Sequence, residues 1–156
     1  ILIFESFTCS HCADFHKNVF PELKTNFVET DLVSIEYKNF PLDLAALNAS
    51  KLAHCKNDGK SNLLHYLYLG QSKWAKGSTI EKLNSNLKNY IKDGGFKINV
   101  TKCLEDKILE ENILNDRIEG VKQYDINSTP TIIINNNKFD KPLTYKNLKK
   151  ALEKLL

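Results

Sequence analysis

The motif Cys9-Ser10-His11-Cys12 constrains this chain more than any other feature of its sequence. It follows a short apolar run, residues 1–7, and comes directly before a stretch whose apolar residues recur with helical spacing. Residues three apart on a helix face the same way, so the two cysteines can close a small disulfide ring. The sequence therefore predicts a reactive cysteine pair at the junction between a buried strand and a helix.

The position of Cys9 at the start of a helix predicts an acidic thiol. Unpaired backbone N–H groups and the positive end of the helix dipole both stabilise a thiolate there. A His11 side chain that is protonated or donates a hydrogen bond would add to this effect. Stabilising the reduced form makes a disulfide a stronger oxidant, by about 30 mV for each 1.4 kcal/mol in a two-electron couple. We therefore expect the pair to accept electrons readily.

A zinc site is the alternative interpretation of the same residues. Cys9, Cys12 and His16 would supply three ligands, with a fourth from elsewhere. Structural zinc sites usually contain a second close cysteine pair, and Cys55 and Cys103 are too far apart to be one. A purely structural disulfide is also disfavoured, because so small a ring constrains little of the unfolded chain. The pattern therefore favours redox chemistry, and no metal is expected.

The other two cysteines suggest a structural disulfide. An even count of four fits pairing in an oxidising compartment. A bond between Cys55 and Cys103 would close a long loop and stabilise the fold by roughly 4 kcal/mol in the chain-entropy description. The alternative is that both are buried free thiols acting as small apolar residues.

Hydrophobic periodicity predicts strands near both ends of the chain and helices between them. The expected order is a strand over 1–7, a helix over 10–29 interrupted at Pro21, a strand over 32–40, helices from 42 to 124, short strands at 131–135 and 138–139, and a helix capped by Thr144. Strands from both ends must share one sheet, because neither end has enough strands alone. We therefore expect an α/β domain, residues 1–42 and 125–156, with a helical insertion, residues 43–124.

Composition and charge exclude several classes of protein. The chain has 156 residues, of which 42% are hydrophobic, as expected for an ordinary globular domain with an insertion. A net charge of +3 is too small to argue for nucleic acid as a partner. No apolar run approaches the roughly 20 residues of a membrane-spanning helix. The chain lacks Met and opens on a strand-like run, which suggests a mature or trimmed segment whose leader has been removed.

A second motif, Ser128-Thr129-Pro130, leads into the late apolar strand. A proline in this place is more often a plain trans edge residue than a functional one. Together with the cysteine motif, however, it resembles the thioredoxin-like superfamily and, within it, the DsbA-type thiol oxidases of the bacterial periplasm. The resemblance spans nearly the whole chain and rests on Phe7-Thr8-Cys9-Ser10-His11-Cys12, Asn39-Phe40-Pro41-Leu42 and Thr129-Pro130.

The resemblance implies a thioredoxin-like fold with an inserted helical subdomain and a protein dithiol–disulfide oxidoreductase that needs no cofactor. Cys9 would be the exposed nucleophile and Cys12 the buried resolving thiol. Pro130 would be cis and would place Thr129 beside the sulfurs, where its backbone can pair with an extended substrate. Thr129 and His11 would tune the redox potential. The expected site residues are Cys9, Ser10, His11, Cys12, Thr129 and Pro130.

Two features depart from the pattern of the superfamily. A buried carboxylate often lies six positions before the first cysteine, where it assists proton transfer, and that position is Ile3 here. Glu5 lies two residues further along and can point to the same strand face, so it is the candidate for proton transfer. The first strand of the fold would also have to precede Ile1, unless the sheet is smaller than usual.

The resemblance also implies partners and a location. Substrates would be reduced exported proteins or peptides, and a membrane quinone-linked protein of DsbB type would reoxidise the cysteine pair. The expected location is the bacterial periplasm, in agreement with the cysteine content. A disulfide isomerase or reductase of the same fold is the runner-up, since a threonine before the cis-proline occurs in isomerases too. Isomerases commonly need a dimerisation domain, and the sequence shows none.

Overall fold

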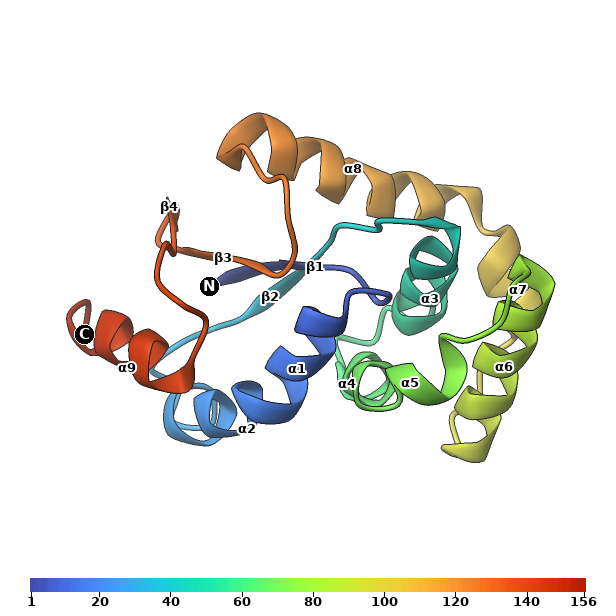
Figure 1. The fold of residues 1–156 in the computed structure, drawn as a ribbon, viewed down its shortest axis with the longest axis horizontal. Coiled ribbons are helices and arrows are strands. Elements are labelled where there is room, and N and C mark those ends of the chain that lie inside the picture. The colour runs from blue at the N-terminus through green and yellow to red at the C-terminus, as the bar shows by residue number, and fades with distance from the viewer.

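The computed structural model describes residues 1–156 and builds them around a four-stranded mixed sheet (Figure 1). The strands are β1 (Leu2–Glu5), β2 (Glu36–Asn39), β3 (Thr131–Ile134) and β4 (Asn137–Lys138), in the spatial order β2-β1-β3-β4. β1 pairs in parallel with β2 and antiparallel with β3, and β4 returns antiparallel to β3. Strands from both ends of the chain therefore share one sheet, as the sequence predicts.

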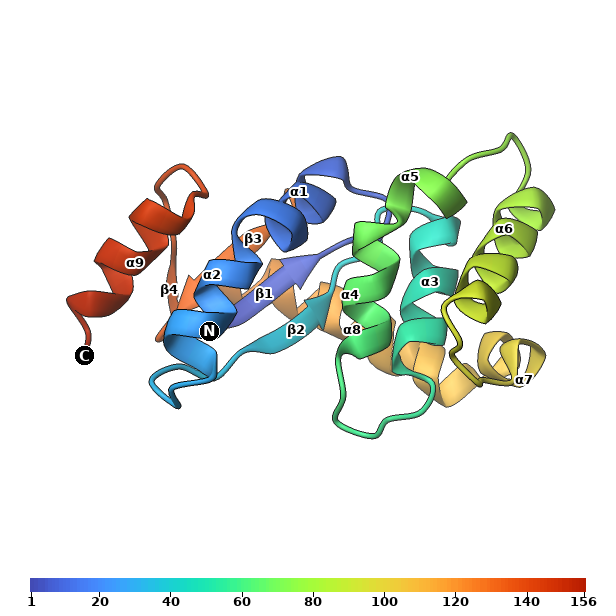
Figure 2. The same ribbon diagram turned by 90° about the horizontal axis from the view of Figure 1, so that it is seen from below.

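Helices cover both faces of the sheet and extend beyond it (Figures 1 and 2). One face carries α1 (Ser10–Asn18), α2 (Phe20–Leu23), the π-helix η1 (Lys24–Val28) and α9 (Tyr145–Glu153), and the other carries α8 (Lys107–Tyr124). Beside the sheet stand α3 (Leu44–His54), α4 (Asn62–Leu69), α5 (Gln71–Trp74), α6 (Ile80–Asp93) and α7 (Val100–Glu105). None of the helices is both long and apolar enough to cross a lipid bilayer.

Most of the helices lie in the sequence between β2 and β3 and stand apart from the ends of the chain that form the sheet. We propose that residues 43–124 form the insertion and that residues 1–42 and 125–156 form the thioredoxin-like domain. Helix α8 joins the two parts, because it contacts both α3 of the insertion and β2 of the sheet. The mixed sheet with helices on both faces agrees with the thioredoxin-like α/β fold that the sequence resemblance implies.

Alternate residues of β1 face helices on opposite sides of the sheet. Ile3 packs in one core cluster with Phe15 of α1, whereas Phe4 belongs to a cluster on the other face. There Gly120 lets α8 come close, since a Cβ at this position would lie 2.7 Å from the ring of Phe4. Glu5 shares the strand face of Ile3, so its carboxylate lies beneath the helix that carries the cysteines.

The single helix expected over residues 10–29 is divided into α1, α2 and η1. Pro21 lies in the first turn of α2, where a missing N–H leaves no hydrogen bond unmade. The interruption expected at this proline is therefore confirmed. The apolar residues expected to face the core are all buried, namely Phe15, Val19, Leu23 and Phe27.

The strands and the later helices differ in length from the patterns that predict them. β1 covers four of the seven residues in its apolar run, and β2 covers only the last part of residues 32–40. Each residue of β2 pairs with one residue of β1, so the partner strand limits its length. The helical region expected up to residue 124 is interrupted at Asp106, whose carboxylate accepts from the N–H of Leu109 and caps α8.

Cys55 and Cys103 form a disulfide, as the sequence predicts. Cys55 ends α3 and Cys103 lies in α7, so the bond closes a segment that contains α4, α5 and α6. Cys103 is buried in the core cluster that also contains Trp74. The disulfide therefore ties the beginning of the insertion to its later part.

Replacing both Cys55 and Cys103 with alanine should lower the free energy of unfolding by roughly 4 kcal/mol, because a cross-link over 48 residues is lost. Urea denaturation of the wild type and the double variant at one pH measures this difference. The pKa of Cys9 in the same variant serves as the control for an intact redox site. A loss below about 1 kcal/mol would show that the bond does not constrain the unfolded chain as this argument requires.

Candidate active site

Cys9 caps the N-terminus of α1, and Cys12 lies one turn further along the helix. The carbonyl of Cys9 accepts hydrogen bonds from the N–H groups of Cys12 and Ala13, both at 3.2 Å. Both thiols are free, but Cys9 is partly exposed while Cys12 is completely buried. An incoming sulfur can therefore reach Cys9 and not Cys12.

The loop before β3 lies directly against Cys9. The peptide bond between Thr129 and Pro130 is cis. The Cys9 thiol donates a hydrogen bond of 3.3 Å to the Thr129 carbonyl, although 120 positions separate the two residues in the sequence. The hydroxyl of Thr129 is buried and has no hydrogen-bond partner. It is therefore available as a donor when Cys9 loses its proton.

The surroundings of Cys9 lower its pKa to about 5. The largest contribution is a hydrogen bond from the Cys12 thiol, and partial burial opposes it. The Thr129 side chain and the backbone N–H groups of Cys12 and His11 lower the pKa further. Cys9 is therefore ionised at neutral pH when the pair is reduced.

Cys12 behaves in the opposite way. Burial raises its pKa far above the ordinary value, and the hydrogen bond to Cys9 and the negative charge of Glu5 raise it further. Cys12 therefore stays protonated in the reduced protein. If Cys9 and Cys12 form a disulfide, the sulfur of Cys12 must receive a proton inside the fold when that bond opens.

Glu5 is buried beneath α1 with only 4% of its surface exposed. Burial raises the pKa of this carboxyl group, and the charge and hydrogen bond of His16 oppose the rise. Its Oε2 lies 2.8 Å from Nε2 of His16, while Oε1 is buried without a partner. The negative charge of Glu5 helps to raise the pKa of the buried Cys12 thiol. Glu5 lies two residues after Ile3, and Ile3 occupies the position at which the superfamily pattern places a carboxylate.

Ser10 and His11 lie between the cysteines and are both exposed. Ser10 is the first residue of α1. His11 contributes its backbone N–H to the stabilisation of the Cys9 thiolate. A role for the imidazole of His11 in redox tuning stays a prediction.

Two further residues support the site and carry no recognisable motif. Gln71 of α5 donates from Nε2 to the carbonyls of Phe7 at 2.7 Å and Cys9 at 2.9 Å, which fastens the active-site loop to the insertion. Tyr68 of α4 stacks on Phe7 and on His16, with ring centroids 4.4 Å and 4.1 Å apart. Tyr68 is buried in the core cluster that also contains Trp74, and its contact with the site depends on the tertiary fold.

His16 does not lie on a solvated helix face and is not free to bind a metal with the cysteines. It is 2% exposed, and its two ring nitrogens face Glu5 and His65. No group of three or more His, Cys, Asp or Glu side chains is placed to hold a metal ion. The structure therefore gives no support to a zinc site built from Cys9, Cys12 and His16.

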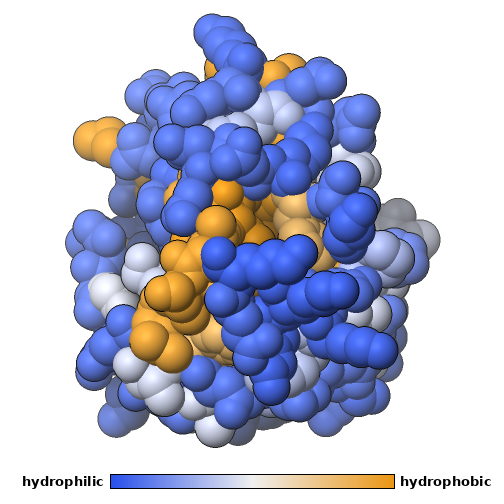
Figure 3. All heavy atoms as spheres, turned by 90° about the vertical axis from the view of Figure 1, so that its left-hand side faces the viewer, coloured by the Kyte–Doolittle hydropathy of each residue, from blue (hydrophilic) through white to orange (hydrophobic).

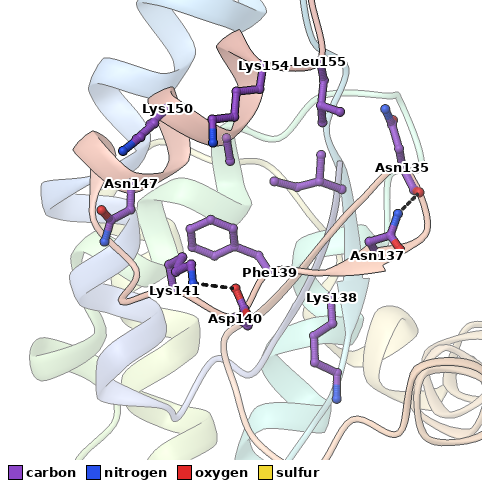
Figure 4. A pocket seen from close by; sticks show the side chains of 12 residues that line it. Asn135, Asn137, Lys138, Phe139, Asp140, Lys141, Asn147, Lys150, Lys154 and Leu155 are labelled. Atoms are coloured by element: carbon purple, nitrogen blue, oxygen red, sulfur yellow. Dashed lines mark hydrogen bonds and ion pairs between the residues drawn. The ribbon is translucent and has the colours of Figure 1, made fainter.

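Two pockets lie at different distances from the redox pair. One of about 450 Å³ lies beside Thr8 and Gln71, between the active-site loop and the insertion. The other, of about 470 Å³, lies at the end of β3 remote from Pro130, with Phe139 and Leu155 among its lining residues (Figure 4). The side of the molecule that carries β4 and α9 shows an apolar area among hydrophilic side chains (Figure 3). The first pocket alone borders the loop that carries Cys9.

Comparison with known proteins agrees with this fold and site. Residues 1–154 match the sequence model of a family described as thioredoxin. The chain therefore belongs to the thioredoxin family. Among solved structures, Wolbachia pipientis α-DsbA1 superposes with a TM-score of 0.84 at 25% identity, over 99% of this chain and 83% of that one. Oxidised BdbD from Bacillus subtilis superposes with a TM-score of 0.80 at 18% identity, over 98% and 84% of the two chains.

Curated relatives point in the same direction. The "Putative protein-disulfide oxidoreductase" of Rickettsia prowazekii (strain Madrid E) is 30% identical over the whole of this chain and 58% of its own length. The "Probable disulfide bond formation protein D" of Bacillus anthracis is 28% identical over the whole of this chain and 73% of its own length. The chain spans about half the length of several rickettsial relatives. The likeness to DsbA-type proteins seen in the sequence is thereby confirmed.

Replacing Thr129 with valine should raise the pKa of Cys9 above its value of about 5, because the thiolate loses a hydroxyl donor while the side-chain volume is kept. Ultraviolet absorbance of the thiolate, followed against pH in the reduced protein, measures the midpoint. Ser128→Ala is the matched control, since Ser128 is exposed. An unchanged midpoint in Thr129→Val would remove the hydroxyl from the set of groups that stabilise the thiolate.

The depressed pKa should also make the stability of the reduced protein depend on pH. Cys9 titrates near 5 in the folded protein and near its ordinary value of 9.0 when unfolded. Reduced wild type should therefore gain stability over reduced Cys9→Ser as the pH rises from 5 to 9, and lose that gain as the pH falls through 5. Denaturant unfolding of both proteins across this range measures the difference. A constant difference would contradict a thiolate in the folded state.

Proposed function

We propose that this chain is a dithiol–disulfide oxidoreductase that introduces disulfides into exported proteins through the pair Cys9–Cys12. The contrast between the two sulfurs carries the proposal: Cys9 is acidic and reachable, whereas Cys12 is buried and resists ionisation. A stabilised thiolate favours the reduced form of the pair, so the disulfide form is a strong oxidant. Similarity to α-DsbA1 supports this assignment.

In the proposed reaction, a substrate thiolate attacks Cys9 of the oxidised pair. The bond between Cys9 and Cys12 breaks, and its electron pair goes to the sulfur of Cys12, which takes up a proton. A second substrate thiolate then attacks the substrate sulfur of this mixed disulfide, and Cys9 leaves as a stabilised thiolate. The substrate loses two electrons and the cysteine pair gains them. Of the two thiol protons of the substrate, Cys12 receives the equivalent of one and solvent receives the other.

Thr129 and Pro130 are proposed to hold the substrate beside Cys9. The backbone here enters the sheet next to the sulfur, where an extended peptide can form main-chain hydrogen bonds. The pocket beside Thr8 and Gln71 lies next to the same loop and offers room for substrate side chains. Glu5 is proposed as the group that exchanges a proton with Cys12, since it is buried with one oxygen unpartnered.

The partners and the compartment belong to the same proposal. An enzyme that passes its disulfide to substrates must be oxidised again, and we propose a membrane quinone-linked protein of DsbB type for that step. The disulfide between Cys55 and Cys103 supports an oxidising compartment such as the bacterial periplasm. An isomerase or reductase of the same fold is the competing function, and it requires a less oxidising pair.

Replacing Cys9 with serine should abolish oxidation of a reduced peptide, because the sulfur that forms the mixed disulfide is lost. Replacing Cys12 with alanine should instead trap that mixed disulfide, since no thiol is left to release the substrate from Cys9. Non-reducing electrophoresis after incubation with a peptide disulfide detects the adduct. Full peptide oxidation by Cys9→Ser, or the absence of any adduct with Cys12→Ala, would contradict the roles proposed for the two cysteines.

Equilibration with glutathione distinguishes the oxidase from its competitor. The oxidase proposal requires a reduction potential well above the value of about −270 mV that is typical of thioredoxin. A potential near or below that value, together with reduction of insulin, would favour the reductase. Activity in refolding scrambled ribonuclease would favour the isomerase, because an isomerase can also have a potential well above that of thioredoxin.

A further inference from the structure

A continuous series of hydrogen bonds leads away from Glu5. Its Oε2 lies 2.8 Å from Nε2 of His16, and Nδ1 of His16 lies 2.9 Å from Nδ1 of His65. Nε2 of His65 then lies 3.3 Å from the hydroxyl of Tyr37. The four residues come from β1, α1, α4 and β2, so only the tertiary fold brings them together. Of these four residues, only Glu5 takes part in the proposed thiol chemistry.

The series runs from the interior to the surface. Glu5 and His16 are buried, with 4% and 2% of their surfaces exposed. His65 and Tyr37 are only partly buried. One end therefore lies in the interior, beneath the helix that carries Cys12, and the other end is partly exposed.

Aromatic side chains hold both imidazole rings in place. Tyr68 stacks on His16 at 4.1 Å with an angle of 6° between the planes, and Phe20 stacks on His65 at 4.3 Å and 21°. Tyr37 meets the ring of His65 edge-on at 83°. One flat face of each imidazole is covered by an aromatic ring, and the ring nitrogens at the edges make the hydrogen bonds of the series. This packing restricts the rotation of both imidazole rings.

The hydrogen bonds allow two complete patterns, because a neutral imidazole has one donor and one acceptor. When Glu5 is ionised, His16 donates to Glu5, His65 donates to His16, and Tyr37 donates to His65. When Glu5 carries the proton, all three bonds can reverse direction. The two patterns differ only by the transfer of one proton along the series, and neither leaves a ring nitrogen without a partner.

We propose that His16, His65 and Tyr37 form a relay that carries protons between Glu5 and solvent whenever the cysteine pair changes its redox state. When the disulfide opens, Glu5 gives its proton to the Cys12 sulfur, and the relay returns one proton to Glu5 from water. When the pair is reoxidised, Cys12 loses its proton and the relay releases it in the opposite direction. One proton thus passes for each two-electron exchange. The relay rests on the proposed function, because a pair that does not cycle has no need of it.

The charges around the relay keep its outer imidazole neutral. Burial lowers the pKa of His65 to about 3, and the positive charge of Lys24 on η1 lowers it too. Burial and the charge of Glu5 raise the pKa of Tyr37, so its hydroxyl keeps its proton. His16 faces Glu5, which belongs to β1, and it also faces His65 and Tyr68, which belong to α4. A neutral His65 between two partners passes a proton on and does not retain it.

The test follows the opening of the Cys9–Cys12 disulfide by excess dithiothreitol in a rapid-mixing experiment. Fluorescence of Trp74, the single tryptophan, reports the reaction because Trp74 shares a core cluster with Cys12. His65→Phe keeps an aromatic ring but removes both nitrogens, and should slow the opening about tenfold or more in dilute buffer. His65→Ala should be slowed as well, and added imidazole should restore its rate but not that of His65→Phe. His54→Phe, which changes a histidine of α3 outside the relay, should open at the wild-type rate.

The equilibrium measurements separate a relay from a structural role. The reduction potential and the pKa of Cys9 should stay at wild-type values in both His65 variants, because a relay changes rates and not end states. A wild-type opening rate in His65→Phe, equal slowing in His54→Phe, or a slowed His65→Ala that imidazole does not rescue would overturn the relay. The proposed function fails separately: wild-type protein would then fail to oxidise reduced peptides, while dithiothreitol would still open the disulfide.

Discussion

The hydrogen bond that Cys12 donates to the Cys9 thiolate is the interaction on which the site depends. It gives the largest contribution to the low pKa of Cys9, and burial of Cys12 keeps its proton in place. The start of α1 adds backbone N–H groups, and the loop at Thr129 supplies a further donor. The fold thus places two chemically identical side chains, three positions apart, in surroundings that push their pKa values in opposite directions.

A buried thiol such as Cys12 needs a proton donor inside the fold. The alternating direction of side chains along β1 explains how Glu5 can take this place. Successive residues of β1 face opposite sides, so a carboxylate at Glu5 reaches the same face as one at the position of Ile3 would. Glu5 in place of Ile3 keeps a carboxyl group beneath α1, where the proposed proton transfer needs it, while Ile3 fills the core beside Phe15. The departure from the superfamily pattern is therefore compatible with the chemistry, because the period of a strand makes the two positions equivalent in direction.

The sequence could predict features that depend on neighbours along the chain. The cysteine motif, the interruption at Pro21 and the mixed order of strands and helices all follow from local patterns, and the structure agrees with them. Strand lengths could not be predicted, because β2 extends only as far as its partner. Gln71 and His65 could not be identified either, since a polar side chain in a helix has no local signal for a contact more than 40 positions away.

The fastening of the active-site loop by Gln71 has a consequence for protein engineering. Helices α4 and α5 lie between the two ends that the Cys55–Cys103 bond joins, and they supply both this fastening and the outer imidazole near Tyr37. A minimal thioredoxin scaffold that carries only the Cys-Ser-His-Cys motif would therefore have the two sulfurs but would lack the contacts made by Gln71 and His65. Transplanting the proposed redox function would therefore require moving α4 and α5 together with the four residues of the motif.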